Sequence, residues 1–255
     1  MTKKAWIIFI VICVAILGSL IWTTRQGEKL DLSGVDPLLK QSASDINGQI
    51  ADHTIGNTEA KVVIIEYGDF QCPGCSTASP ILNKVAEKYK SQILLIFRNN
   101  PLSTIHPNAF AAAAAAESAG KQGKYWEMHN TLYEEQSTWE SLESNKRTDY
   151  FITKAQALGL DTESFKSSLN DADRTGSSIK KKVAFDKALA EKQNVATSTP
   201  AIIVNGTVVT DKYFKDGKIV DGSTSGAAQV WTDADAFGSL IINPILREKG
   251  IALPK

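Results

Sequence analysis

Two apolar runs on either side of an amphipathic segment constrain the fold of this chain more than any other feature. The first run, KVVIIEY at Lys61 to Tyr67, is nearly continuous and rich in β-branched residues, which is typical of a strand covered on both faces. Apolar residues then recur at helical spacing from Ile81 to Tyr89, and QILLIF at Gln92 to Phe97 indicates a second buried strand. This order predicts a βαβ unit.

The remainder of the chain predicts a helical block, a hairpin and a closing helix. From about residue 105 to 195 the composition changes to Ala, Lys, Glu and aromatic residues, in four or five helical stretches. Strand character returns at 201–210, where the Asn205-Gly206 pair predicts a tight turn. Residues 212–233 are rich in Gly, Ser and Asp and predict a loop, and 235–249 predict a helix. We therefore expect an α/β fold whose mixed sheet contains an inserted helical subdomain.

A long uncharged stretch precedes this body. Residues 5–24 contain no charged side chain, and a helix of this length crosses about 30 Å of hydrocarbon, so we predict a transmembrane anchor after a cytoplasmic tail of residues 1–4. A cleaved signal peptide fits less well, because the stretch exceeds about 7 to 15 residues and no A-x-A-like site closes it. Residues 25–55 are polar without a sustained period and predict a tether. The folded domain is expected at 56–255.

Charge and cysteine content exclude several classes of protein. The chain carries 28 basic and 28 acidic residues, so its formal net charge is zero and no nucleic acid partner is implied. The one dense basic run, Lys180 to Lys182, predicts a solvated helix face. Three cysteines are too few for a disulfide scaffold, and Cys13 lies within the uncharged stretch. Chemistry is therefore expected from the remaining pair, Cys72 and Cys75.

This pair, in DFQCPGCST, allows three interpretations. A structural disulfide across two residues closes a very small loop and would stabilise little. A zinc site needs more ligands, and the sequence offers no second CxxC and only three scattered histidines, His53, His106 and His129. A redox couple fits best, because a first cysteine at a helix start faces unpaired N–H groups and the positive end of the dipole, which favour thiolate. Cys72 would then attack and Cys75, one turn later, would resolve the mixed disulfide.

The residues between the cysteines agree with a helix start. Pro73 suits the first helical position, since its missing N–H would have no partner there. Gly74 adds no side chain, so we expect its N–H to approach Cys72 without further electrostatic help. Pro80 follows within the same helix.

Four landmarks together resemble one known family. They are VVIIEYGDFQCPGC, the helix proline Pro80, the block HPNAFAAAAAAESAGKQGKYWEMHNTLYEEQ, and STPAIIVNG. The chain is similar to the thioredoxin-fold thiol-disulfide oxidoreductases and, within them, to the membrane-tethered DsbA-like proteins of bacteria. The resemblance spans about Ile55 to Ile251 and implies a thioredoxin-like fold with a helical insertion at about 105–195.

The resemblance implies roles for further residues. Glu66 matches a buried acid that relays protons to the resolving cysteine, and its apolar neighbours should raise its pKa. Pro200 matches the family's cis-proline, which lies beside the cysteines and, with Thr199, pairs with the bound peptide like a strand. Pro73 and Gly74 are expected to contact the substrate as well.

These residues lead to a functional expectation. We expect a single-pass protein of the bacterial cell membrane whose extracytoplasmic domain is a dithiol oxidase, introducing disulfides into exported proteins with free thiols through Cys72-Cys75 and needing no metal or other cofactor. A membrane quinone-linked partner of the DsbB or vitamin K epoxide reductase type would reoxidise it. Because Gly74 stands where the best known members carry histidine, the pKa of Cys72 is expected between about 3.5 and about 7. A reductase or isomerase of the same fold and a cysteine-based metallochaperone are the alternatives.

Overall fold

The computed structural model describes residues 6, 9–10, 12–15, 18 and 30–254. Its internal contacts divide the chain into two units, Met1–Val35 and Asp36–Lys255. Most of the predicted anchor, residues 5–24, lies outside the described residues. Within the described part of the chain, no helix has both the length and the apolar character needed to span a bilayer.

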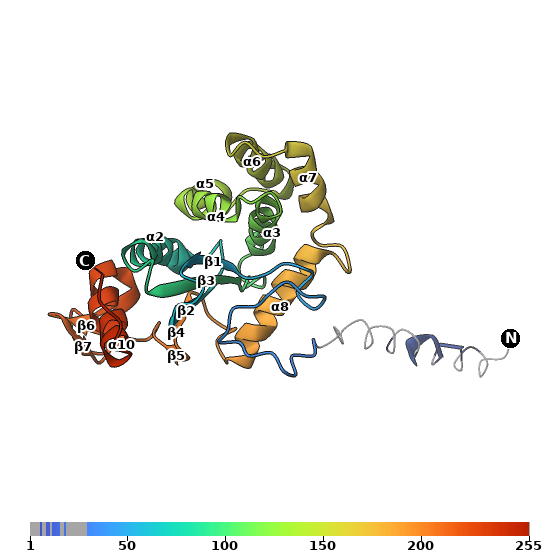
Figure 1. Ribbon diagram of the computed structural model, residues 1–255. Helices are drawn as coiled ribbons and strands as arrows, with labels where there is room; N and C mark the ends of the chain where they lie inside the picture. The colour runs from blue at the N-terminus through green and yellow to red at the C-terminus, as the bar shows by residue number, and fades with distance from the viewer. Residues whose placement is uncertain (1–5, 7–8, 11, 16–17, 19–29, 255) are drawn as a thin grey trace. The chain divides into compact units, whose positions relative to one another are not determined.

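A five-stranded mixed sheet forms the centre of the second unit (Figure 1). Its strand order is β1-β3-β2-β4-β5, with β2 and β3 parallel and the other neighbours antiparallel. The strands are β1 (His53–Gly56), β2 (Val62–Gly68), β3 (Ile93–Asn99), β4 (Ala201–Val204) and β5 (Thr207–Val208). Helix α2 (Pro73–Lys88) connects β2 to β3, so the predicted βαβ unit is confirmed.

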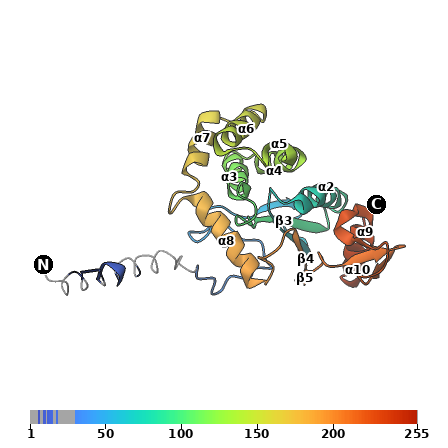
Figure 2. The same ribbon diagram turned by 180° about the vertical axis from the view of Figure 1, so that it is seen from behind.

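The sheet is covered on both faces, as the apolar runs predict. Along β2, Ile64 packs in the core that contains α2, whereas Tyr67 points the other way and donates a hydrogen bond to Gln193 at the end of α8 (Ser178–Lys192). Helices α2 and α8 lie on opposite sides of the sheet (Figures 1 and 2). Both faces of β2 are therefore withdrawn from water.

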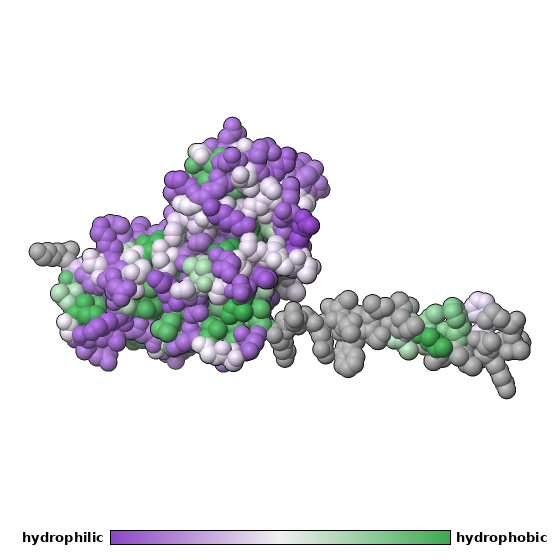
Figure 3. Space-filling model, turned by 45° about the vertical axis from the view of Figure 1, so that its right-hand side comes forward, coloured by the Kyte–Doolittle hydropathy of each residue, from purple (hydrophilic) through white to green (hydrophobic). Residues whose placement is uncertain are grey.

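Six helices lie between β3 and β4 in the described chain, which confirms the predicted helical insertion with one helix more than the upper expectation. They are α3 (Ala109–Gly120), α4 (Tyr125–Glu134), α5 (Gln136–Trp139), α6 (Ser144–Ala157), α7 (Thr162–Asp171) and α8. Helix α3 is almost completely buried. Its small alanine side chains allow α4, α7 and α8 to pack closely against it. Figure 3 shows mainly hydrophilic side chains over the outer part of this block.

The predicted tether is wrong for residues 36–55. They belong to the folded unit, and β1 extends the sheet by pairing with β3. The guanidinium of Arg98 lies 2.7 Å from the Asp52 carboxylate and also donates to the carbonyl oxygens of Pro37 and Leu39. Long-range ion pairing attaches this polar segment to the folded unit. The segment has no hydrophobic periodicity from which its folded structure could be predicted.

The lysine run of α8 also differs from expectation. Lys182 is fully buried rather than solvated, and its Nζ lies 2.7 Å from Asp186 and 3.0 Å from Asp52. With Arg98, these residues form a buried ionic cluster on the α8 side of the sheet. Lys181 and Lys187 of the same helix remain exposed. A buried charge is tolerated here because its partners are buried with it.

The end of the chain contains more structure than predicted. Asn205 and Gly206 both have positive φ, 46° and 85°, as the predicted tight turn requires. Residues 212–233, expected to be a loop, contain an antiparallel three-stranded sheet of order β7-β6-β8. Its strands are β6 (Tyr213–Lys215), β7 (Lys218–Val220) and β8 (Ala228–Gln229). The closing helix is divided into α9 (Ala234–Phe237), a π-helical turn (Gly238–Ile242) and α10 (Asn243–Glu248).

Candidate active site

Cys72 occupies the N-cap of α2, four residues after the end of β2. A turn closed by a hydrogen bond from the Cys72 N–H to the Asp69 carbonyl leads into the helix, which begins with Pro73. Both thiols are free, Cys72 is 8% exposed and Cys75 is completely buried. The site therefore offers one slightly exposed cysteine and a second one that is fully buried.

The surroundings of Cys72 favour its thiolate. A hydrogen bond from the Cys75 thiol is the largest influence, and it lowers the pKa of Cys72 to about 5 against the opposing effect of burial. The Thr199 hydroxyl, which is placed to donate to a thiolate, and hydrogen bonds from the backbone N–H groups of Cys75 and Gly74 act in the same direction. The value lies within the range expected from the sequence, and the expected approach of the Gly74 N–H is confirmed.

Thr199 and Pro200 meet the cysteines from a distant part of the chain. Their peptide bond is cis, and the Cys72 thiol donates to the Thr199 carbonyl oxygen at 3.3 Å. A Cβ atom on Gly74 would lie 3.1 Å from Pro200 Cδ and 3.7 Å from the Cys72 sulfur. The absence of a side chain at Gly74 thus permits close contact between the helix start and the proline. The expected cluster of Cys72, Pro73, Gly74, Thr199 and Pro200 is assembled.

Glu66 lies within β2 and is only 2% exposed. Burial raises the pKa of Glu66 to about 8, and the charge on Cys72 acts in the same direction. Burial is also the main reason why the pKa of Cys75 is raised well above its ordinary value, with Cys72 and Glu66 adding to the effect. Around neutral pH both buried groups hold protons while Cys72 does not, so the site contains an acid able to exchange protons near Cys75.

Two supporting residues were not found by sequence reasoning. Gln136 of α5 donates through its Nε2 to the carbonyl oxygens of Phe70 at 2.7 Å and Cys72 at 3.0 Å. Asp69 is buried, and its carboxylate accepts from the Gln71 N–H and lies 2.8 Å from the His106 ring. The short D-x-Q turn before the cysteine was a local signal for Asp69, whereas nothing in the sequence links Gln136 to this loop.

In residues 30–254 and the described positions before them, no group of three or more His, Cys, Asp or Glu side chains could hold a metal ion. His129 packs edge-on against the Phe97 ring, and burial lowers its pKa to about 4. His129 therefore behaves as a neutral core residue.

Comparison with known proteins agrees with this geometry. The thioredoxin family model matches residues 49–219, about two thirds of the chain. The chain belongs to the thioredoxin family. This thioredoxin-family chain is 37% identical over 155 residues to the Na(+)/H(+) antiporter NhaA 1 of Mycolicibacterium vanbaalenii, a match to 61% of the chain and 23% of the antiporter. The chain thus spans less than a quarter of the first curated relatives that it matches.

A second relative covers more of its own length. The thioredoxin-family chain is 29% identical over 195 residues to the probable disulfide bond formation protein D of Bacillus cereus, which covers 71% of this chain and 83% of that protein. The fold is similar to the crystal structure of oxidised BdbD from Bacillus subtilis, with a TM-score of 0.57, 22% identity and coverage of 84% and 98% of the two chains. The thiol-disulfide oxidoreductase MdbA from Corynebacterium diphtheriae gives a TM-score of 0.52 at 21% identity, over 70% and 93%. The expected resemblance to DsbA-like thiol-disulfide oxidoreductases is confirmed, together with the expected thioredoxin-like fold.

Proposed function

We propose that this chain is a dithiol oxidase that transfers a Cys72-Cys75 disulfide to the thiols of other proteins. One observation carries the proposal: the thiol of Cys72, which is the more exposed of the pair, has a pKa of about 5, and the pKa of the fully buried Cys75 thiol is raised. The low pKa stabilises the reduced form of the pair, and a couple with a stabilised reduced form is a strong oxidant.

The reaction proceeds by two exchanges. A substrate thiolate attacks the Cys72 sulfur of the disulfide, a substrate–Cys72 bond forms, and Cys75 leaves with the bonding electron pair. Glu66, which holds its proton near neutral pH, supplies a proton for the departing Cys75 sulfur. A second substrate thiolate then attacks the substrate sulfur of the mixed disulfide and releases Cys72 as a thiolate. The substrate loses two electrons and the enzyme gains them.

Substrate is proposed to bind beside the proline. An extended peptide would run next to Thr199 and Pro200 and over Pro73 and Gly74. A neighbouring hollow of about 530 Å³ includes Pro200 and Val208 in its lining and offers room for its side chains.

Location and partners are part of the same proposal. Residues 5–24 would anchor the protein in the bacterial cell membrane with the catalytic domain on the extracytoplasmic side, where disulfides persist. Its substrates would be exported proteins with free thiols. A membrane quinone-linked protein of the DsbB or vitamin K epoxide reductase type would return Cys72 and Cys75 to the disulfide.

The reduction potential against glutathione tests the direction of the reaction. A value near about −120 mV is expected for an oxidase, whereas one near about −270 mV would mark a thioredoxin-like reductant. Metal-free protein should oxidise a reduced two-cysteine peptide, and Cys72→Ser should abolish that activity. Retention of activity in Cys72→Ser would exclude the proposed chemistry.

A further inference from the structure

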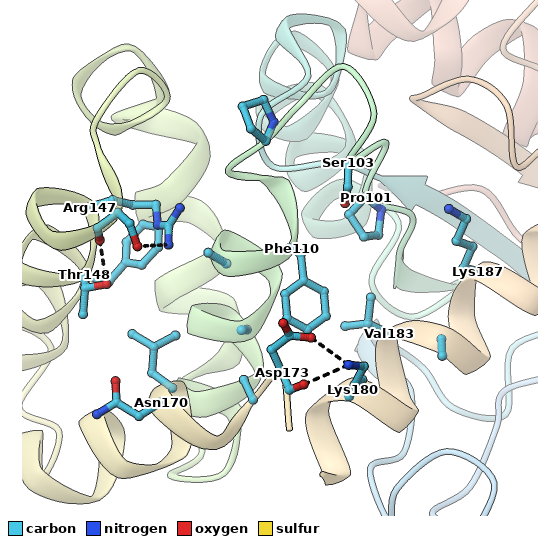
Figure 4. A pocket seen from close by; sticks show the side chains of 18 residues that line it. Pro101, Ser103, Phe110, Arg147, Thr148, Asn170, Asp173, Lys180, Val183 and Lys187 are labelled. Carbon is cyan, nitrogen blue, oxygen red and sulfur yellow. Dashed lines mark hydrogen bonds and ion pairs between the residues drawn. The ribbon is translucent and has the colours of Figure 1, made fainter. Parts of the chain in front are cut away.

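A large cleft opens in the helical block, away from the hollow beside Pro200. It has a volume of about 710 Å³ and is lined by α3, α6, the end of α7 and α8, together with the loop after β3 (Figure 4). Its floor is apolar and includes Phe110, Phe151, Leu169 and Val183. A cleft of this size and lining has the dimensions of a ligand site.

Arg147 of α6 stands on one wall of the cleft with an uncompensated charge. Its guanidinium donates to the side-chain oxygens of Asn108 and Ser144, which are both neutral. Burial lowers the pKa of Arg147, and no carboxylate among the described residues forms an ion pair with it. An anion bound at this wall would therefore meet a full positive charge in a partly desolvated position.

The opposite wall, formed by α8, carries two lysines (Figure 4). Lys180 is paired with Asp173 at 2.9 Å, so its charge is largely balanced. Lys187 is exposed and has no hydrogen bond or ion pair with the described residues. The cleft thus presents two separate unpaired cations, Arg147 and Lys187, on either side of an apolar floor.

The cleft is connected to the redox site by a short hydrogen-bonded path. Gln71 precedes Cys72, and its side-chain oxygen accepts from the Asn108 N–H at 2.7 Å. The Asn108 side chain in turn accepts from Arg147 and donates to the Glu140 carbonyl oxygen at 2.9 Å. One residue therefore separates the neighbour of Cys72 from the wall of the cleft, and the guanidinium is held in place before any ligand arrives.

Topology places both sites at one edge of the sheet. Strands β2 and β3 are parallel, Cys72 follows the end of β2, and Pro101 of the cleft follows the end of β3. Both sites therefore lie at the carboxyl ends of these two neighbouring strands.

We propose that this cleft is a second binding site for protein substrates of Cys72 and takes an extended acidic segment, with carboxylates at Arg147 and Lys187 and an apolar side chain on the floor between them. The inference rests on the proposed oxidase function and adds a substrate preference to it. Two cations on opposite walls suit two carboxylates spaced along a peptide better than the single charged end of a lipid. The hydrogen-bonded link from Arg147 through Asn108 to Gln71, next to Cys72, also favours a segment of the substrate chain.

Binding without redox chemistry tests the site first. A labelled, cysteine-free peptide of alternating acidic and apolar residues is titrated with the full-length protein in nonionic detergent, beside a peptide with Asn and Gln in place of the acids. We expect the acidic peptide to bind more tightly, and Lys187→Glu to weaken it by about fivefold or more. Lys181→Glu is the matched control, because Lys181 is exposed on the same helix and does not line the cleft.

Three outcomes would overturn the proposal. The first is equal affinity for both peptides. The second is that Lys187→Glu and Lys181→Glu weaken binding of the acidic peptide equally, which would indicate non-specific electrostatic attraction to the protein surface. The third is that a soluble short-chain anionic lipid displaces the labelled peptide while the acidic and neutral peptides bind equally well. That result would assign the cleft to lipid.

Oxidation kinetics then separate the two proposals. With reduced two-cysteine peptides that carry acidic or neutral flanks, Lys187→Glu should raise KM for the acidic peptide about fivefold at unchanged kcat and leave the neutral peptide unaffected. Oxidation of both peptides with equal KM would overturn the cleft proposal alone. Failure of the wild-type protein to oxidise either peptide would instead overturn the oxidase function.

Discussion

The sulfur of Cys72 lies 3.3 Å from the carbonyl oxygen of Thr199, and the hydroxyl of the same threonine has no hydrogen-bond partner in the described chain. The two groups favour opposite protonation states. A carbonyl oxygen accepts from a thiol and repels a thiolate, whereas a free hydroxyl can rotate to donate to the thiolate. The donors prevail, since the pKa of Cys72 is lowered to about 5.

Thr199→Val keeps the shape of the side chain and removes its hydroxyl. We expect the pKa of Cys72 to rise in this variant, because a donor to the thiolate is lost while the carbonyl oxygen remains. Absorbance of the thiolate at 240 nm as a function of pH measures it. Thr199→Ser retains the hydroxyl and should titrate near the wild-type value, and identical pKa values in Val and Ser variants would contradict this role.

Cys75 is expected to influence the neighbouring sulfur more strongly. Its thiol is the largest cause of the lowered pKa of Cys72, so Cys75→Ala should raise that pKa further than Thr199→Val does. Cys75→Ser keeps a donor of similar size and is the control. The rate of alkylation of Cys72 by iodoacetamide across pH 3 to 9 reports both values, and an unshifted Cys75→Ala profile would assign the effect to the backbone alone.

The lowered pKa predicts how the stability of the reduced protein depends on pH. An acid whose pKa is lowered from 9.0 to about 5 by folding stabilises the folded state fully above pH 9, and this stabilisation disappears as pH falls through 5. The disulfide form has no such group. The difference in Tm between reduced and oxidised protein should therefore shrink from pH 8 to pH 4, and a constant difference would refute the shift.

Glu66 affects the pH dependence of stability in the opposite direction to Cys72. Its pKa is raised from 4.5 to about 8, so the unfolded chain releases this proton first and the group destabilises the fold increasingly from pH 4.5 to 8. Glu66→Gln cannot ionise, and its stability relative to the wild type should increase between pH 4 and pH 8 in urea titrations of the oxidised proteins. Glu59→Gln, at an exposed glutamate, should show no such trend.

The buried ionic cluster predicts a large difference between adjacent lysines. Lys182→Met leaves Asp52 and Asp186 buried without one of their cations and should lower the free energy of unfolding by about 3–5 kcal/mol. Lys181→Met changes an exposed side chain and should stay within about 0.5 kcal/mol. Urea denaturation of both variants measures the contrast, and equal losses would mean that the cluster contributes nothing specific.

Local signals explain what could be predicted from the sequence. The β-branched run before Gly68, the Pro73 helix start and the helical spacing after it are short-range features, and they led to the βαβ unit and to the position of the cysteine pair. Placement of Pro200 beside Cys72 required the family resemblance, because the two are far apart in the chain and no local pattern joins them.

Long-range polar contacts explain what was missed. Lys182 has the sequence surroundings of a solvated lysine, and only the packing of residues 36–55 against Arg98 brings Asp52 to it. Gln136 likewise contacts the cysteine loop through a backbone carbonyl, an acceptor that every residue provides. Periodicity detects apolar faces and has no means of pairing buried polar groups.

Contacts from Arg98 to residues 37, 39 and 52 also bear on how far the folded domain could move from the proposed anchor. An extended chain covers at most about 3.6 Å per residue, so a free linker of residues 25–55 would allow a reach of about 110 Å. With the proposed anchor in the bilayer, residues 25–35 alone leave about 40 Å. With that anchor, the shorter linker would keep the thiols close to the bilayer surface, where polypeptides emerge before they have folded.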